Sequence, residues 1–261
     1  MSDLEVYLYG LLVALLLAAL TWLVSLFKTD VSIVDSLWSL ILLALCTTYF
    51  LLIEFSTPRG TIVLMLVAIW ALRLSAYITW RNWGEPEDAR YQAIRRRHSP
   101  NFAIKSLWLV FLLQGTLAWI ISLPLLTAIG ASRPLGALDA MAALLVLFGT
   151  AFESIADAQL AAFKARSGSQ GQVMDKGLWR YTRHPNYFGE CCVWWGFYLF
   201  ALAAGGWWSI VSPLLMTLLL LRISGVALLE KDIHERRPAY RDYVARTNAF
   251  IPGLPKHAPT P

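Results

Sequence analysis

Long apolar runs alternate with short polar segments along almost the whole chain. A bilayer core is crossed by about 20 apolar residues in helical form, and by this length the runs predict seven spanning helices. Their expected bounds are 5–27, 33–55, 61–80, 106–129, 136–160, 188–203 and 207–228. The pattern therefore predicts an all-α integral membrane protein with a single transmembrane domain, residues 1–261, whose tail, 249–261, is frayed.

Composition agrees with a membrane protein and gives no sign of a disulfide or metal framework. Hydrophobic residues make up 57% of the chain and charged residues 15%, whereas soluble domains are about 45–50% apolar. The first run is long for a signal peptide and lacks a basic region and a cleavage site, so we interpret it as a spanning helix. Cys46, Cys191 and Cys192 fall in or at the ends of apolar runs, and we expect them to pack as small apolar groups.

The 22 Lys and Arg residues are distributed unevenly between the expected loops. In a seven-span arrangement, 18 of them fall on one side: at Lys28, in the loops 81–105 and 164–183, and in the tail. Because cytoplasmic loops carry the excess of Lys and Arg, we expect the N-terminus outside and the C-terminus in the cytoplasm. Short loops and the lack of a retention signal favour a bacterial inner membrane.

Ionisable side chains inside the expected spans mark candidate sites, because each costs at least about 2.5–3.5 kcal/mol to insert. Asp35 stands near the start of the second span, with Trp38 one turn later, and Arg73 lies within the third. Glu153 and Asp157 lie one turn apart near the cytoplasmic end of the fifth span. The short side chain of Asp35 cannot reach the interface, so it needs a buried partner or a water-filled cavity.

The richest polar segment is DKGLWRYTRHPNYFGE, residues 175–190, between two apolar runs. Guanidinium groups suit phosphates, and carboxylates and amides suit ribose and nicotinamide groups, so this cationic face predicts a phosphorylated dinucleotide. The chain has no glycine-rich Rossmann or Walker loop, so helix ends and loop side chains would hold it. Topology and anionic membrane lipids explain Arg95, Arg96 and Arg97. Cations beside a bilayer do not predict a nucleic-acid partner.

The segment GLWRYTRHPNYFGE resembles the steroid 5-alpha-reductase family. The similarity extends over roughly residues 30–252, through DSLW, LRLSAYITWRNWGEPEDARY, the acidic end of the fifth span and AYRDYVARTNAFIP. The core RHPNY alone also resembles isoprenylcysteine carboxyl methyltransferases and sterol reductases. The family resemblance implies a seven-helix fold that holds NADPH in a cytoplasm-facing cavity and reduces the C4–C5 double bond of 3-oxo-Δ4 steroids.

The resemblance also implies which residues bind the cofactor. Asn186 matches an asparagine at the nicotinamide end, and Glu190 matches the glutamate that follows it. Glu153 and Asp157 match polar positions near the adenosine part, and Lys164 matches a basic residue near the 2′-phosphate. The full set expected at NADPH is Arg73, Arg81, Tyr91, Glu153, Asp157, Lys164, Arg180, Arg183, His184, Asn186, Tyr187, Glu190, Glu230, Arg237, Tyr240 and Tyr243.

Asp35 matches a family glutamate that holds the steroid 3-oxo group together with a tyrosine of the third span. Here the acid is one methylene shorter, and Trp70 occupies the tyrosine position, with Tyr77 one to two turns along. We therefore expect the catalytic donors among Asp35, Trp38, Trp70 and Tyr77. A protonated Asp35 would donate to the carbonyl oxygen itself, whereas an ionised one would orient a second donor or a water.

Two other functions fit parts of the pattern. A membrane methyltransferase would bind S-adenosylmethionine, whose net positive charge suits a cavity lined by arginines less well than the charge of NADPH. A lipid binder or transporter is a non-enzymatic alternative, although inverted repeats and broken midspan helices are missing. The lipophilic substrate would enter from the bilayer; steroids, other sterols and enoyl thioesters stay open, as does the oligomeric state.

Overall fold

The computed structural model describes residues 2–53, 57–168, 171–223, 225–226, 230 and 239–256. Within these ranges the regular structure is helical, apart from an isolated bridge between Thr182 and Asn248. The chain divides into two compact units. Unit 1 comprises Met1–Asp139 and Phe200–Ser212, and unit 2 comprises Ala140–Leu199 and Pro213–Pro261.

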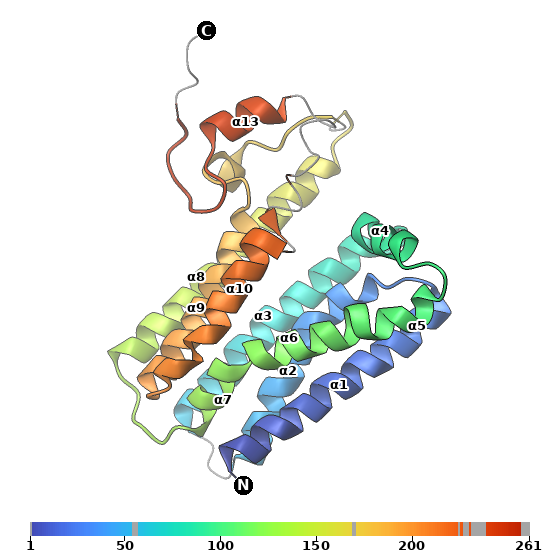
Figure 1. Cartoon of the computed structure of the whole chain (residues 1–261). Helices are drawn as coiled ribbons and strands as arrows, with labels where there is room; N and C mark the ends of the chain where they lie inside the picture. Colours follow the sequence, from blue (N-terminus) through green and yellow to red (C-terminus); the bar gives the residue numbers. More distant parts are fainter. Residues whose placement is uncertain are drawn as a thin grey trace. The chain divides into compact units, whose positions relative to one another are not determined.

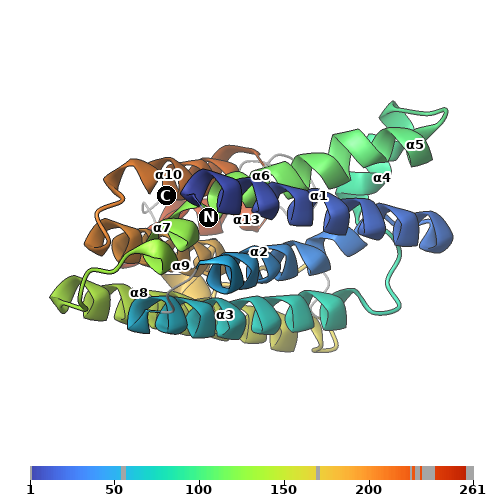
Figure 2. The ribbon, with the colours of Figure 1, turned by 90° about the horizontal axis from the view of Figure 1, so that it is seen from below.

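Unit 1 consists of long apolar helices that lie side by side, together with shorter helical segments (Figures 1 and 2). In chain order they are α1 (Asp3–Lys28), α2 (Ile33–Leu52), α3 (Pro58–Asn82), the short α4 (Ala89–Arg97), α5 (Phe102–Ser106), the π-helical η1 (Leu107–Leu112), α6 (Leu113–Ile121) and α7 (Leu123–Gly130), with the 3₁₀ turn η3 (Trp207–Ile210). α2 packs against α1 and α3, and α6 packs against α1 and α2. The apolar core of the unit therefore lies around α2.

Local sequence explains where the long helices begin. At α1, the hydroxyl of Ser2 accepts a hydrogen bond from the backbone N–H of Glu5, and the carboxylate of Glu5 accepts one from the backbone of Ser2. At α3, Thr57 caps the helix by accepting from the backbone of Gly60, and Pro58 takes the first helical position. These side chains satisfy donors that the helix leaves unpaired at its start.

A buried ion pair fixes the start of α3. The side chain of Arg59 donates to both carboxylate oxygens of Asp139, at 2.7 and 3.0 Å, and the residue is only 1% exposed. It also donates to the carbonyls of Arg133 and Pro134. Removing either charged partner would leave an uncompensated charge in the core. Through its contacts with Arg133, Pro134 and Asp139, Arg59 orders the segment that leads into α8 (Ala137–Lys164).

Unit 2 is formed by most of α8, of α9 (Pro185–Ala203) and of α10 (Val211–Leu218), which continues into the π-helical η4 (Leu219–Ile223). A 3₁₀ turn, η2 (Gly177–Arg180), and the short α13 (Tyr240–Arg246) complete it. α8 and α9 approach closely because a glycine lies at their contact. A Cβ atom on Gly189 would lie 2.7 Å from the backbone nitrogen of Glu153 and from the backbone oxygen of Gly149.

Five helices among the described residues are long and apolar enough to cross a membrane: Asp3–Lys28, Ile33–Leu52, Pro58–Asn82, Phe102–Gly130 and Ala137–Lys164. They correspond to the first five predicted spans, and the prediction of an all-α membrane protein is confirmed. The predicted sixth and seventh spans correspond to α9 and to the shorter apolar helix Trp207–Ile223. Seven spans and their orientation stay predictions.

The tail that was expected to be frayed is hydrogen-bonded where the structure describes it, up to residue 256. The backbone N–H of Gly253 donates to the carbonyl of Tyr181 at 3.0 Å, and that of Lys256 donates to the carbonyl of Arg246 at 2.8 Å. The hydroxyl of Thr182 donates to two further carbonyls of this segment. Its backbone therefore finds partners on the loop before α9, which the Pro-rich composition did not indicate.

Candidate functional site

One polar cluster of unit 1 is centred on Asp35, in the first turn of α2. Its Oδ1 accepts a hydrogen bond from the hydroxyl of Tyr91 at 2.6 Å, and its Oδ2 accepts one from Nη2 of Arg90 at 2.7 Å. The same guanidinium donates to Asp88, which caps α4 by accepting from the backbone N–H of Arg90 at 2.8 Å. Asp35 thus has the partners that its short side chain requires, and they come from α4.

Contacts with the loop between α1 and α2 hold α4 in this position. Glu87 accepts from the backbone N–H of Val31 at 2.9 Å and pairs with Arg95 at 2.7 Å. The hydroxyl of Ser32 accepts from the backbone N–H of Asp88 at 2.8 Å. Figure 1 shows α4 at the end of the unit where α3 ends and α5 begins. The residues next to Asp35 are therefore set by pairing between segments distant in sequence.

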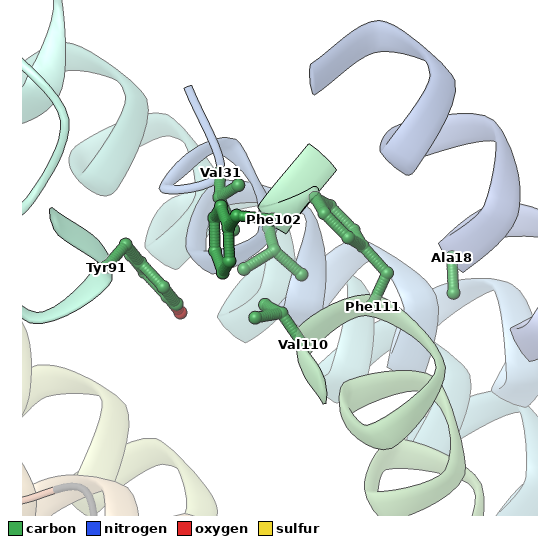
Figure 3. Close-up of a cluster of buried hydrophobic side chains, with 7 residues drawn as sticks. Ala18, Val31, Tyr91, Phe102, Val110 and Phe111 are labelled. Atoms are coloured by element: carbon green, nitrogen blue, oxygen red, sulfur yellow. The ribbon is translucent and has the colours of Figure 1, made fainter. Parts of the chain in front are cut away.

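The ring of Tyr91 is buried, with 6% of the residue exposed. It belongs to an apolar cluster with Ala18, Val31, Val34, Phe102, Val110 and Phe111 (Figure 3). Burial, followed by the negative charge of Asp35, raises the pKa of Tyr91. The phenol therefore keeps its proton near neutral pH and is a hydrogen-bond donor.

The charges around Asp35 favour one route for a proton. Burial alone would raise the pKa of Asp88, but hydrogen bonds from Arg90 lower it. Burial alone would lower the pKa of Arg90, and the hydrogen bonds and charges of Asp88 and Asp35 raise it. Arg90 thus stays cationic and has only donors. Because it occupies Oδ2, a proton can pass between Asp35 and Tyr91 only at Oδ1.

The other predicted donors lie elsewhere in unit 1. Trp38, on α2, has a buried indole nitrogen without a hydrogen-bond partner among the described residues. Trp70 is completely buried. Tyr77 has the guanidinium carbons of Arg73 and Arg81 at 5.7 and 5.9 Å from its ring centroid, which is within the range of a cation–π contact. The structure thus gathers two arginines of the set expected at NADPH around a tyrosine.

In unit 2, Glu230 joins several residues that were predicted to bind the cofactor. Nε and Nη2 of Arg183 donate to its two oxygens at 2.7 and 2.9 Å, and Nε2 of His184 lies 2.9 Å from Oε1. The hydroxyl of Tyr240 donates to Oε1 at 3.3 Å. Burial alone would raise the pKa of Glu230, but hydrogen bonds from His184 and Arg183 lower it to about 2. Since Arg183 also donates to the carbonyl of Thr247 at 2.6 Å, this network ties the C-terminal segment to the loop before α9.

A second group lies where α8 and α9 pack. Glu153 and Asp157 are each 4% exposed, and Glu190 is 6% exposed. Asn186, in the first turn of α9, donates to Asp157 at 3.5 Å, and Glu190 accepts from the indole of Trp194 at 3.1 Å. Buried carboxylates and an amide near a helix N-terminus are suitable partners for ribose hydroxyls and for the carboxamide of a nicotinamide.

The remaining predicted cofactor residues are dispersed. Lys164 and Arg180 are exposed. Tyr187 stacks on the imidazole of the Glu230 network, with ring planes 5° apart, and Tyr243 donates to a backbone carbonyl of η2. Arg237 lies outside the described residues. No group of three or more His, Cys, Asp or Glu side chains in the described ranges could hold a metal ion.

The sequence interpretation missed Arg90 and Asp88 and assigned Tyr91 to the cofactor. The segment EPEDARY contains one usable signal, since an Asp directly before a short helical stretch is typical of a helix N-cap. That signal predicts the start of α4, but it does not indicate that Arg90 and Tyr91 meet Asp35.

Sequence comparison gives the family. The model of a family described as "Protein of unknown function (DUF1295)" matches residues 21–247. The chain belongs to the DUF1295 family. An uncharacterized protein of Schizosaccharomyces pombe is 28% identical over 278 residues, covering 95% of this chain and 80% of that protein. No solved structure matches. Because this relative is fungal, it gives no support to the expected bacterial inner membrane.

Proposed function

We propose that the protein is a membrane-embedded, NADPH-dependent reductase of the C4–C5 double bond of 3-oxo-Δ4 steroids. The observation that carries the proposal is the hydrogen bond from Tyr91 to Asp35, beside Arg90. It places a buried phenol beside an acid; when Asp35 is protonated and donates to the phenol oxygen, the phenol O–H can donate to a carbonyl oxygen. The motif resemblance and membership of DUF1295, a family that includes steroid 5-alpha-reductase-like proteins, support the same reaction.

When bound, the reduced nicotinamide supplies the hydride for the β-carbon of the enone. Negative charge then develops on the carbonyl oxygen, where a hydrogen bond from Tyr91 is stronger in the transition state than in the ground state. Arg90 holds the far oxygen of Asp35, so Asp35 acts through Tyr91. With a proton on Oδ1, Asp35 donates to the phenol oxygen, which leaves the single phenol hydrogen for the carbonyl oxygen. After the phenol has protonated the enolate, Asp35 returns its proton to the phenol and takes a new one from water. The hydride and one proton, which ends on the α-carbon, saturate the double bond.

We assign cofactor binding in unit 2 to the polar residues where α8 and α9 pack. Asn186 and Asp157 contribute an amide and a carboxylate, as the family resemblance implies. Arg183 and His184 are already bound to Glu230, so we propose that they shape the cofactor site by holding the loop before α9. Lys164 is exposed at the end of α8, where the family resemblance implies a basic residue near the 2′-phosphate.

A membrane methyltransferase that uses S-adenosylmethionine is the alternative function. One observation favours it: Glu153, Asp157 and Glu190 are buried carboxylates of one unit, and carboxylates stabilise a sulfonium cation. The two cofactors differ in the sign of their net charge, so a direct comparison of the two reactions separates the proposals.

The test is an activity comparison on the full-length protein in detergent. NADPH with a panel of 3-oxo-Δ4 steroids, sterol enones and enoyl thioesters is compared with S-adenosylmethionine and isoprenyl thiols. We expect oxidation of NADPH that depends on an added enone, and no methyl transfer. Methyl transfer without enone-dependent oxidation would refute the proposal and establish the alternative.

We also propose seven spans, with the N-terminus outside and the C-terminus in the cytoplasm. Single cysteines placed at Ser2 and at Lys256 test this orientation in sealed vesicles. A membrane-impermeant thiol reagent should reach one of the two from outside only after the membrane is opened. Equal labelling of both positions in intact vesicles would contradict an odd number of spans.

A further inference from the structure

The short helix α4 and its C-cap have an inner face and an outer face. Residues of the inner face are buried or partly buried: Tyr91, Ile94, Arg95 and His98. Residues of the outer face are exposed: Ala89, Ala93, Arg96 and Arg97. Positions three and four apart share one face of a helix. The helix therefore presents two adjacent arginines outward, while on the inside it brings Tyr91 to Asp35.

Two lysines add to the positive charge at the C-terminal end of α4. Nζ of Lys105 donates to the carbonyl of His98, the residue that ends the helix, at 3.1 Å. Lys28 is exposed and directly precedes Thr29, whose carbonyl accepts from Arg95 at 3.1 Å. The helix itself, ARYQAIRRR, contains no acidic residue, and the two acids directly before it pair with its own arginines. This surface is therefore complementary to an anion.

Large aromatic side chains are exposed at the ends of the neighbouring helices. Trp80 and Trp83 are exposed at the end of α3, and Phe27 is exposed at the end of α1. A short segment leads from α3 into α4, which lies at the same end of unit 1 (Figure 1). Because tryptophan is enriched at the level of the lipid headgroups, these rings indicate that the outer face of α4 lies at the depth of the lipid phosphates.

The contacts that hold α4 in place are few. The helix has nine residues, of which Tyr91 is buried, and isolated helices shorter than about 12–15 residues are marginal in water. Its docking depends on polar contacts that Glu87 and Ser32 make with neighbouring backbone groups. A ligand that binds the docked helix and not the detached one stabilises docking by mass action. Binding at the outer face would therefore favour the contact between Tyr91 and Asp35.

We propose that an anionic phospholipid binds Arg96 and Arg97 and thereby holds α4, together with Tyr91, against the Asp35 cluster. The two guanidinium groups bind the lipid phosphate, and the acyl chains lie against the exposed aromatic rings. Lys28 and Lys105 add to the attraction. Lipid binding and the docking of α4 do not depend on the reaction that the protein catalyses. The effect of the lipid on turnover rests on the proposed function.

The test measures amide hydrogen exchange of α4 in the full-length protein in detergent, titrated with soluble dihexanoyl phosphatidylglycerol. We expect exchange to slow and to saturate with this lipid, and phosphatidylcholine with the same chains to have no effect. Arg96→Gln and Arg97→Gln should each raise the half-saturating concentration about fivefold, the scale for one cation near an anionic surface, and salt should do the same. Arg241→Gln, at an exposed arginine of α13, is the matched control.

Four results would overturn the inference: no slowing by phosphatidylglycerol; equal slowing by phosphatidylcholine; an unchanged half-saturating concentration when both arginines are replaced; or an equal shift in Arg241→Gln. Slowing by glycerol 3-phosphate at the same concentrations would also overturn it, because the arginines would then bind a soluble anion.

A second arm measures enone reduction in nanodiscs with and without phosphatidylglycerol. We expect faster turnover with the anionic lipid, and turnover that is independent of it would refute the link to the Asp35 cluster. Because the exchange experiment contains neither NADPH nor enone, a protein that reduces no enone would leave its result unaffected. Failure of the lipid site and failure of the proposed reaction are therefore distinguishable.

Discussion

The hydroxyl of Tyr91 and Oδ1 of Asp35 lie 2.6 Å apart, although 56 positions separate the two residues in the sequence. The family resemblance pointed to the third span for the tyrosine that assists this acid, whereas the hydrogen bond comes from α4. Arg90 completes the arrangement from the other side of the carboxyl group. An acid that enters the apolar helix α2 is thus matched by a short polar helix at the end of unit 1.

Tyr91→Phe removes one hydroxyl and keeps the ring. Because loss of one transition-state donor typically costs about 2.7–4 kcal/mol, we expect enone reduction to fall by about two to three orders of magnitude. NADPH affinity should not change. Turnover with the best enone and NADPH binding by fluorescence give the two readouts. A Tyr91→Phe variant with wild-type turnover would exclude the phenol as donor.

Asp35→Ala leaves Tyr91 and Arg90 without their shared acceptor. We expect reduction to be abolished with only a small loss of NADPH affinity. Asp35→Asn, whose amide can still hydrogen-bond to the phenol, should retain more activity than Asp35→Ala. The ratio of the two turnover numbers is the measurement. Equal activity in Asp35→Ala and the wild type would remove Asp35 from the mechanism.

The Glu230 network should make stability depend on pH in the acid range. The pKa of Glu230 is about 2 in the folded protein and ordinarily 4.5, so its contribution is fully present above pH 4.5 and is lost as pH falls toward 2. This difference corresponds to roughly 3 kcal/mol. Thermal unfolding of the wild type and Glu230→Gln should differ by a constant amount near neutral pH and converge below pH 4.5. If the stabilities of the wild type and Glu230→Gln converged as the pH was raised, the assignment of an ionised, hydrogen-bonded Glu230 would be wrong.

Gly189→Ala should destabilise the protein, because the added methyl meets backbone atoms of α8 at 2.7 Å. Forcing extra volume into a packed contact costs about 1–3 kcal/mol. Gly136→Ala is the matched control, since a Cβ atom there has no neighbour within 4 Å. The test is the melting temperature of each variant in detergent, monitored by fluorescence-detected size-exclusion chromatography. Equal melting temperatures would show that α8 and α9 can separate at no cost.

Most of the helical architecture could be predicted from the sequence, because the length and continuity of an apolar run decide whether a helix can span a bilayer. The helix bounds depend on more local features. α3 begins before its apolar run, at Thr57 and Pro58, and α8 extends beyond its run to Lys164. Capping and polar helix ends lie outside the hydropathy signal, so the predicted spans differ from the helices at their ends.

The candidate site was only partly predictable for a different reason. Asp35 was identified because a charge in an apolar run is costly and therefore informative. Arg90 carries no such signal, since it stands in a polar segment where a cation needs no explanation. Arg59, which forms a buried pair with Asp139, stands in a polar segment between two predicted spans and escaped for the same reason. Asp139 lies inside the fifth predicted span and was overlooked there. Long-range partners of this kind follow from the packing of segments, which a single sequence does not encode in a readable pattern.

Isotope transfer from cofactor to product tests the central claim most directly. The purified wild-type protein is incubated with a 3-oxo-Δ4 steroid and NADPH that carries deuterium at the transferable C4 position, and the product is analysed by mass spectrometry and NMR. The account predicts one deuterium at C5 of a 3-oxo-5α-steroid, with the signal strongly reduced in Tyr91→Phe. A product that forms without deuterium at C5, or a Tyr91→Phe variant that forms it as fast as the wild type, would contradict the account.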